Sequence, residues 1–212
     1  MGRRGWLAGT CALGLMFGTA DSFANVLSSP YQSLGSDVTG TAWARTAEVV
    51  SLLLDAGWAW AALAVAAGWA ARTFTRGLIA DPLSLAAATF AYFCTDAALR
   101  AESASVIEMV FWGIAGLIVG PVLGAIGDGI RRFGLRGALA GLVVPAGAAI
   151  QMFLQPPGLA GVPGGWIPNS EADLARVLVW GLAAVATAVV LGRLVLHARA
   201  LGSQGGVQSP AP

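Results

Sequence analysis

The sequence predicts an all-α fold, a polytopic transmembrane bundle of about six helices, and three observations support this prediction. Hydrophobic residues make up 57% of the 212 residues and charged residues only 11%, whereas soluble domains carry about 25% charged residues. The mean hydropathy is +0.73. The apolar residues also gather in segments close to the ~20 residues that span a bilayer as a helix. We therefore expect residues 1–200 to form one membrane bundle.

Six apolar segments follow one another along the chain, separated by charged residues, prolines and glycines. They cover residues 5–28, 46–71, 82–99, 105–130, 135–155 and 172–197. Arginines precede the first two segments, Pro82 opens the short third one, and a basic turn at 131–136 separates the fourth from the fifth. Acids precede the fourth and the sixth segment. Residues 201–212 are rich in Gly, Ser, Gln and Pro, a composition that predicts a disordered tail.

The placement of arginine predicts how the bundle is oriented. With six helices, the N-terminus, the 72–81 loop, the 128–136 loop and the C-terminus share one side. That side carries nine arginines, namely Arg3, Arg4, Arg72, Arg76, Arg131, Arg132, Arg136, Arg193 and Arg199. The opposite side carries only Arg45, Arg100 and Arg176. Because basic residues favour the cytoplasmic side, we expect a multi-pass protein of the cell membrane with both termini cytoplasmic.

The start of the chain has a second interpretation. Arg3 and Arg4, the apolar run that follows them and the Ser22-Phe23-Ala24 stretch resemble a signal peptide, with a hint of the twin-arginine type. Cleavage there would leave five helices and place the new N-terminus outside the cell.

Four acidic residues lie well inside the apolar segments: Asp21, Asp55, Asp96 and Glu108. Ionisable groups in hydrocarbon are costly, so they usually face a bundle interior or a wet cavity and carry function. The expected topology places all four in the outer half of the bundle, whereas Asp81 falls in the inner 72–81 loop. The pattern predicts a pocket within the membrane that is lined by carboxyl groups.

Amide and aromatic side chains accompany these acids. Asn25 follows Asp21 by four residues and Trp112 follows Glu108 by four, so each pair shares a helix face. Two tryptophans closely follow Asp55, and a tyrosine precedes Asp96. We expect Asp55, Glu108 and Asp21 to be catalytic. The expected substrate-binding residues are Asn25, Trp58, Trp60, Tyr92, Asp96 and Trp112.

Acids in an apolar cavity favour proton transfer. Burial favours the neutral carboxyl group, which can then act as a general acid, and nearby aromatic faces stabilise a developing cation. We expect Asp55 or Glu108 to donate a proton to a prenyl chain or its epoxide, while Asp21 and Asn25 orient or re-accept that proton. The sequence has neither a D-D-x-x-D arrangement for magnesium diphosphate nor a cluster of His and Cys. We therefore expect no metal and no cofactor.

Several of these features also have structural interpretations. Arg100 follows Asp96 by four residues, so the two side chains can form an ion pair instead of a binding site. Gly116, Gly120 and Gly124 repeat at four-residue spacing, a pattern typical of close packing between membrane helices. An acidic pocket would also suit the binding or passage of a cation.

The stretches Phe111-Trp112 and Gly120-Pro121-Val122-Leu123-Gly124, after a Gly-rich first helix, resemble small multi-pass membrane proteins common in actinobacteria. Most of those proteins have no assigned function. In size and acid content the chain is also similar to small integral-membrane terpene cyclases of meroterpenoid and indole-terpenoid pathways. That similarity implies membrane-embedded acids that protonate a prenyl epoxide or alkene, and it assigns no role to an individual residue.

We therefore expect a cofactor-free cyclase or isomerase that acts on a lipophilic, prenylated small molecule within the lipid bilayer and has no nucleic-acid partner. Two alternatives stay open. One is a small substrate-binding or transport component for a cation or amine, and the other is a structural or regulatory membrane subunit. The sequence does not indicate whether the protein has protein partners.

Overall fold

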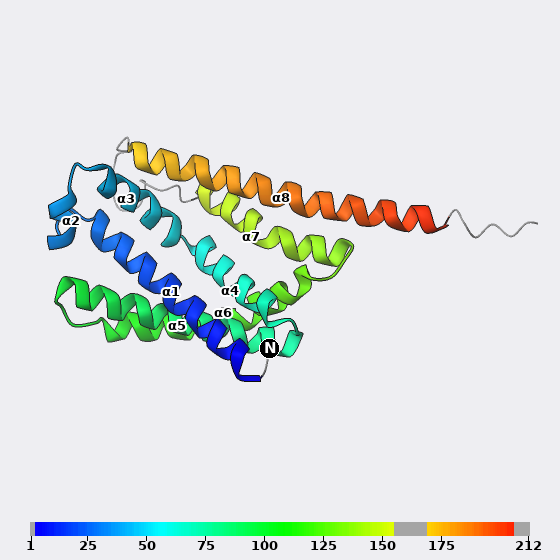
Figure 1. The fold of residues 1–212 in the computed structure, drawn as a ribbon, viewed down its shortest axis with the longest axis horizontal. Helices are drawn as coiled ribbons and strands as arrows, with labels where there is room; N and C mark the ends of the chain where they lie inside the picture. The colour runs from blue at the N-terminus through cyan, green and yellow to red at the C-terminus, as the bar shows by residue number, and fades with distance from the viewer. Residues whose placement is uncertain (1–2, 155–168, 206–212) are drawn as a thin grey trace, which may run out of the picture.

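The computed structural model describes residues 3–154 and 169–205, and the regular elements within these ranges are all α-helices (Figure 1). They are α1 (Arg3–Ser28), α2 (Ser33–Val38), α3 (Ala42–Leu54), α4 (Gly57–Ala71), α5 (Phe74–Arg100), α6 (Val106–Ile130), α7 (Leu135–Leu154) and α8 (Ser170–Gly205). In this part of the chain, α1, α5, α6, α7 and α8 are long and apolar enough to cross a membrane. The bent pair of α3 and α4 makes a sixth span if it is counted as one. The predicted all-α membrane bundle is confirmed.

The second predicted segment differs from the structure in one respect that shapes the site. Residues 46–71 do not form a single helix, because α3 ends at Leu54 and α4 begins at Gly57 with an angle of 65° between them. Asp55 and Ala56 form the break. Non-helical backbone at membrane depth is tolerated where it lines a cavity or is buried in protein. The break therefore already indicates where a cavity is expected.

The third predicted segment is longer than expected, and the predicted 72–81 loop is wrong. Thr73 caps α5 by accepting a hydrogen bond from the backbone N–H of Arg76 at 3.4 Å, so the helix begins at Phe74. Pro82 lies inside α5 and does not start it. As a consequence, Asp81 is a residue of the helix interior. At the other end of the chain, α8 continues to Gly205, within the segment that we predicted as a tail, and residues 206–212 lie outside the described residues.

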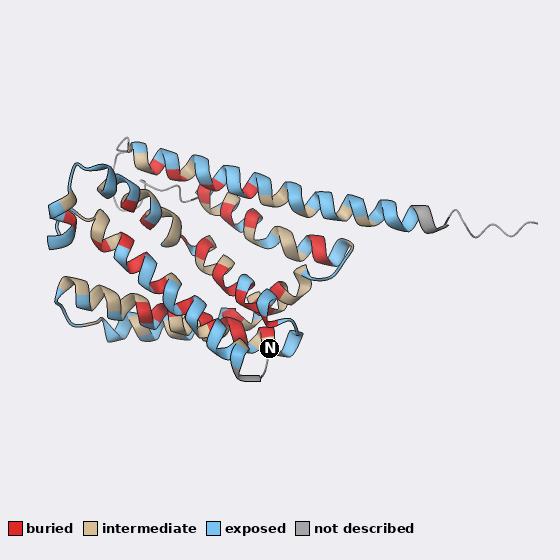
Figure 2. Ribbon diagram, in the orientation of Figure 1, coloured by how far each residue is buried: buried red, intermediate tan, exposed pale blue. Residues whose placement is uncertain are grey.

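Small residues let the central helices approach closely. An added methyl group at Gly14 or Gly18 of α1 would overlap the carbonyl oxygens of Ser84 and Ala88 on α5. At Gly124 of α6 it would overlap the backbone of α5. The Gly116, Gly120 and Gly124 repeat therefore packs α6 against α5, as predicted. Figure 2 shows the buried residues gathered where α1, α4 and α5 meet.

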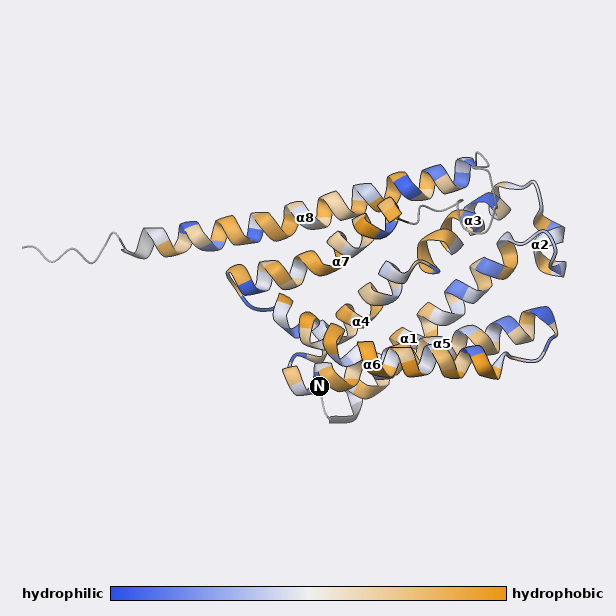
Figure 3. Ribbon diagram, turned by 180° about the vertical axis from the view of Figure 1, so that it is seen from behind, coloured by the Kyte–Doolittle hydropathy of each residue, from blue (hydrophilic) through white to orange (hydrophobic). Residues whose placement is uncertain are grey.

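Hydrophobic residues predominate along α6, α7 and α8 (Figure 3). Leucine, isoleucine and valine are exposed along these helices, for example Ile118 at 69% and Val122 at 61%. Such large exposed apolar surfaces are typical of a membrane-facing protein. We therefore treat α1 and the helices from α3 to α8 as membrane-spanning or membrane-facing.

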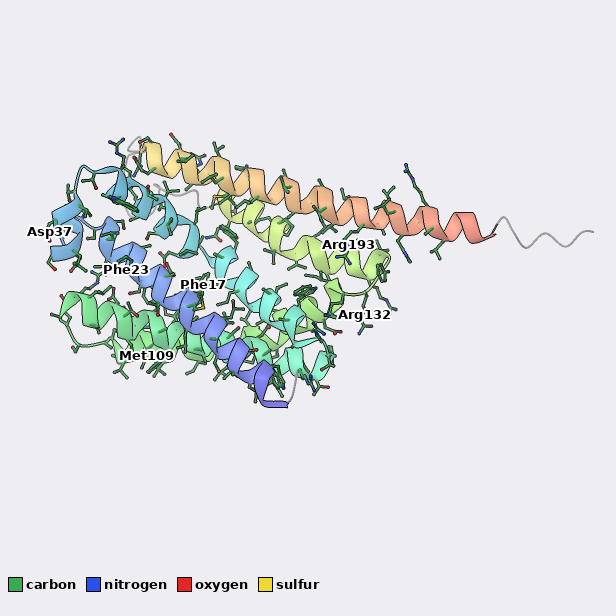
Figure 4. All side chains as sticks on the ribbon, viewed as in Figure 1. Phe17, Phe23, Asp37, Met109, Arg132 and Arg193 are labelled. Atoms are coloured by element: carbon green, nitrogen blue, oxygen red, sulfur yellow. The ribbon has the colours of Figure 1, made fainter. Side chains whose placement is uncertain are left out.

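Most of the arginines lie toward one end of the bundle. The arginine-rich end comprises the start of α1, the turn between α4 and α5, and the turn between α6 and α7 (Figure 1). Figure 4 shows Arg132 at this end and Asp37 of α2 at the opposite end. α8 begins at the opposite end, runs along α7 and extends past the arginine-rich end.

Candidate functional site

The break between α3 and α4 positions Asp55. This residue forms the C-cap of α3, and its backbone N–H donates to the carbonyl of Ser51 at 2.9 Å. The following residue, Ala56, has extended backbone angles and starts α4 in a new direction. The first turn of a helix has N–H groups without partners in the helix. One of them, the N–H of Trp58, donates to Oε1 of Gln151 on α7 at 3.0 Å.

A cavity of about 550 Å³ lies beside this break, between α4, α5 and α6. This volume is in the range of pockets that hold small organic molecules. Its lining residues are Asp55, Gly57, Trp60, Ala61, Leu85, Thr89, Tyr92, Phe93, Glu108, Trp112, Ala115, Gly116, Val119 and Leu123. Two carboxyl groups and four aromatic rings thus line a cavity whose other walls are mostly apolar.

Asp21 lies directly behind the wall of the cavity. Its side chain is fully buried, at 0% exposure, and neither carboxyl oxygen has a hydrogen-bond partner among the described residues. The side chain of Trp60 is the hydrogen-bonding group directed toward it, and Asp55 lies close enough for a charge–charge interaction. The structure therefore brings Asp21 and Asp55 together, with one carboxyl group buried and the other exposed to the cavity.

Tyr92 connects this pair to α5. Its hydroxyl oxygen accepts a hydrogen bond from Nδ2 of Asn25 on α1 at 2.9 Å. The same hydroxyl group interacts electrostatically with Asp55, Asp21 and Asp96. Asn25 lies one turn after Asp21 on α1. The predicted association of Asp21, Asn25, Asp55 and Tyr92 in one site agrees with this geometry.

Aromatic rings support the wall formed by α4 and α5. Trp60 makes edge-to-face contacts with Phe17 of α1, at a centroid distance of 5.4 Å, and with Tyr92, at 6.4 Å. Tyr92 in turn contacts Phe93 at 5.3 Å in the same geometry. Figure 4 labels Phe17 on the part of α1 that faces α4. Phe17 and Phe93 were not predicted. Phe17 lies four residues before Asp21 on α1, and this spacing is the signal that could have identified it.

The α6 side of the cavity carries Glu108 and Trp112. Both residues line the cavity and both are exposed, with Trp112 at 57%. Glu108 lies in the first turn of α6 and forms no ion pair with any side chain that the structure describes. Glu108 belongs to α6, whereas Asp21 and Tyr92 belong to α1 and α5.

Three of the predicted binding residues do not line the cavity: Asn25, which reaches it only through its hydrogen bond to Tyr92, Trp58 and Asp96. Asp96 forms an ion pair with Arg100, with Oδ1 and Nε 2.7 Å apart, so the structural interpretation of this acid is confirmed. Trp58 packs on the other side of α4, against Ala148, Met152 and Val179 of α7 and α8. The bend at residues 55–56 explains this placement, because it removes the continuous helical spacing that linked Trp58 to Asp55.

A second buried acid, Asp81, lies in the same bundle outside the cavity wall. Its side chain is fully buried and neither of its oxygens has a hydrogen-bond partner in the described ranges. The sequence analysis missed it, because Arg76 and Pro82 made this stretch look like a loop. The helix-capping residue Thr73 is the sequence signal that could have placed Asp81 inside a helix.

The described residues contain no group of three or more His, Cys, Asp or Glu side chains placed to hold a metal ion. Comparison of the chain with family models, with curated proteins and with solved structures finds no match. The proposal for its function therefore rests on the geometry of the site.

Proposed function

We propose that this membrane protein binds a lipophilic, prenylated small molecule in the cavity between α4, α5 and α6 and protonates it, as a cofactor-free cyclase or isomerase. The pair formed by buried Asp21 and exposed Asp55 is the observation that supports this proposal most directly. The similarity to small integral-membrane terpene cyclases in size and acid content is consistent with it.

The two carboxyl groups have different environments, which suits different roles. Two carboxylates placed close together in an apolar site cannot both be ionised at low cost, so such a pair holds a proton. Asp21 is enclosed by protein, whereas Asp55 reaches the cavity. In our proposal Asp55 donates its proton to the substrate and is a carboxylate until the proton returns. Asp21, which is enclosed by protein, keeps its own proton throughout, so the pair then carries one negative charge and not two.

The proton returns at the end of the reaction. Transfer of a proton from Asp55 to an alkene carbon or an epoxide oxygen generates a carbocation centre. A second double bond of the same molecule attacks that centre and forms a carbon–carbon bond, and loss of a C–H proton to the carboxylate then restores the acid. The product has the mass of the substrate. The rings of Trp60, Tyr92 and Trp112 line the cavity where a cation would develop.

We also propose that the protein lies in the cell membrane with both termini cytoplasmic. Nine arginines against three support this orientation. The cavity acids then belong to the half of the bundle that faces away from the cytoplasm, and the substrate enters from the bilayer.

Product analysis with matched variants tests the proposed reaction. Membranes containing the unaltered protein, Asp55→Asn, Glu108→Gln or Asp96→Asn are incubated with linear prenylated arenes, indoles and terpenes, with and without terminal epoxides. Because a general acid contributes about 100-fold or more to the rate, Asp55→Asn should reduce formation of an isomeric product by about that factor. The ion-paired Asp96 serves as the control, since its amide variant should keep activity.

A second candidate function is supported by Glu108. This acid and Asp55 are exposed to the cavity and have no basic partner in the described part of the chain. Two such acids beside aromatic rings suit the binding of a lipophilic amine. Saturable binding of a hydrophobic amine that weakens in both Glu108→Gln and Asp55→Asn, together with no isomeric product from any substrate, would contradict the cyclase proposal and favour this one.

A further inference from the structure

Asp81 lies at the point where α4, α5 and α6 cross. A methyl group added at Gly68 of α4 would lie 3.0 Å from Oδ1 of Asp81, and one added at Gly124 of α6 would lie 3.2 Å from its Cγ. The carboxyl group is thus held between two glycine backbones. There is no room for a third side chain to approach it from these two helices.

Among the residues that the structure describes, none forms an ion pair with Asp81, and the backbone of Gly68 is the polar group beside its carboxyl group. α4 carries no ionisable side chain. Apart from Arg3 and Arg4 of α1, whose side chains lie outside the described set, the ionisable groups on the neighbouring helices are Cys11 and Asp21 on α1, Arg76, Tyr92, Cys94, Asp96 and Arg100 on α5, and Glu108 and Asp128 on α6. Asp128 pairs with Arg132, Arg76 stacks on Trp6, and Arg131 donates to the carbonyl oxygen of Trp69. A carboxylate in such surroundings is costly, and a bound proton removes that cost.

The cavity ends close to this carboxyl group. Leu85 lies one helical turn after Asp81 on α5, and Leu123 directly precedes Gly124 on α6. Both leucines line the cavity and belong to one hydrophobic cluster. Among the lining residues of α5 and α6 they are the closest along the chain to Asp81 and Gly124.

The other side of the crossing is closed more tightly. A methyl group at Gly127 of α6 would overlap the backbone of Val65 and approach that of Trp69 on α4. Next to it, the buried alanines Ala67, Ala71 and Ala80 pack against Trp6. The backbone contacts and this apolar cluster separate Asp81 from the arginine-rich end of the bundle.

We propose that Asp81 is a second proton-binding site of this protein, distinct from the Asp21 and Asp55 pair, and that its proton exchanges through the cavity. The ligand is a proton, and a lipophilic carbodiimide is the reagent that reports it. This inference is independent of the proposed function, because it involves neither a substrate nor turnover.

Infrared spectroscopy of the protein in lipid nanodiscs tests whether Asp81 binds a proton. A protonated carboxyl group has a C=O stretch that is resolved from the amide bands. We expect such a band at neutral pH, with one component lost in Asp81→Asn and kept in Asp96→Asn, whose parent carboxyl group is ion-paired. A spectrum of Asp81→Asn that keeps every component would overturn the proposal.

Carbodiimide labelling of the unaltered chain gives the same answer if Asp81→Asn does not fold. The acid proton moves to a carbodiimide nitrogen, the carboxyl oxygen bonds to the central carbon, and an oxygen-to-nitrogen acyl shift leaves a stable N-acylurea. The peptide that contains Asp81 then gains the full mass of the reagent. Absence of this adduct over the whole pH range in which the protein stays folded would overturn the proposal.

A matched pair of variants on α6 tests the route. Val119 lines the cavity, whereas Val122 is exposed on α6 outside it. Val119→Phe should slow labelling of Asp81, and Val122→Phe should leave the rate unchanged. Equal rates in both variants, or faster labelling after Trp6→Ala, would overturn the route through the cavity.

Discussion

At the scale of single residues, hydrogen-bond partners separate the structural acids from those that suit a site. Asp96 and Asp128 each have an arginine four residues later and form ion pairs with it, at 2.7 and 3.2 Å. Glu48 accepts a hydrogen bond from the amide of Asn169 at 2.6 Å. Asp21 and Asp81 are fully buried and have no such partner among the residues that the structure describes. An unsatisfied buried carboxyl group is costly, so these two acids are the ones for which a structural role is least adequate.

The hydrogen bond between Asn25 and Tyr92 makes a measurable prediction at this scale. It joins α1 to α5 beside the acid pair and spans 2.9 Å. A double-mutant cycle with Asn25→Leu and Tyr92→Phe should give a coupling energy of about 1 kcal/mol, the usual net value for such a bond. Unfolding of the four proteins in detergent by denaturant titration measures it. A coupling energy of zero would show that the two side chains do not interact in the membrane protein.

At the scale of helices, glycine contacts hold α4, α5 and α6 together. The crossing depends on backbone approaches that only glycine allows, at Gly68, Gly120, Gly124 and Gly127. The cavity lies directly beside it and shares its helices. Because packed interiors do not deform continuously, a change at the crossing should alter the cavity as well.

Two glycines of α6 provide a matched test of the crossing. Gly124→Leu should destabilise the protein by about 1–3 kcal/mol, the usual cost of overpacking, because a side chain there meets the backbone of α5. Gly113→Leu should be neutral or stabilising, since nothing lies within 4 Å of an added Cβ there and leucine favours helix by up to about 1 kcal/mol over glycine. Thermal unfolding midpoints in detergent compare them. Equal midpoints would contradict the glycine crossing.

Helix boundaries also show how far the sequence could predict this structure. The spans of α1, α6 and α7 were predicted within about two residues at each end, because long apolar runs between charges define them. The break at Asp55 was not predicted, since the apolar run continues through it. The start of α5 was placed too late, because Arg76 and Pro82 suggested a loop.

The residues of the candidate site were likewise predicted where they share one helix, but not where they meet across helices. Sequence spacing correctly grouped Asp21 with Asn25 on one helix face, and Tyr92 was selected because it precedes Asp96. The neighbourhood of Asp21 and Asp55 depends on how α1 packs against the bend between α3 and α4. The spacing of residues within one helix contains no information about such a contact between helices. For the same reason Trp58 was predicted to bind substrate, although it packs against α7 and α8.

At the scale of the whole molecule, the separation of arginines predicts the orientation in the membrane. Asp37 and Arg132 mark opposite ends of the bundle (Figure 4). In a variant with Cys11 and Cys94 replaced by alanine, Asp37→Cys should react with a membrane-impermeant maleimide in intact cells. Arg132→Cys should react only after the membrane is permeabilised. The reverse result would contradict the orientation, and reaction of both cysteines in intact cells would contradict an odd number of spans between them.

The length of α8 has a consequence for the outer shape of the molecule. Its 36 residues, at 1.5 Å each, reach about 54 Å, while the hydrocarbon core of a bilayer is only about 30 Å thick. α8 starts level with the other helices and extends past the arginine-rich end (Figure 1). Its last turns therefore project beyond the other helices and away from the lipid surface. A water-soluble macromolecule that bound these last turns would exert a force on α7 and α3, against which α8 packs. That force would reach the bend that carries Asp55.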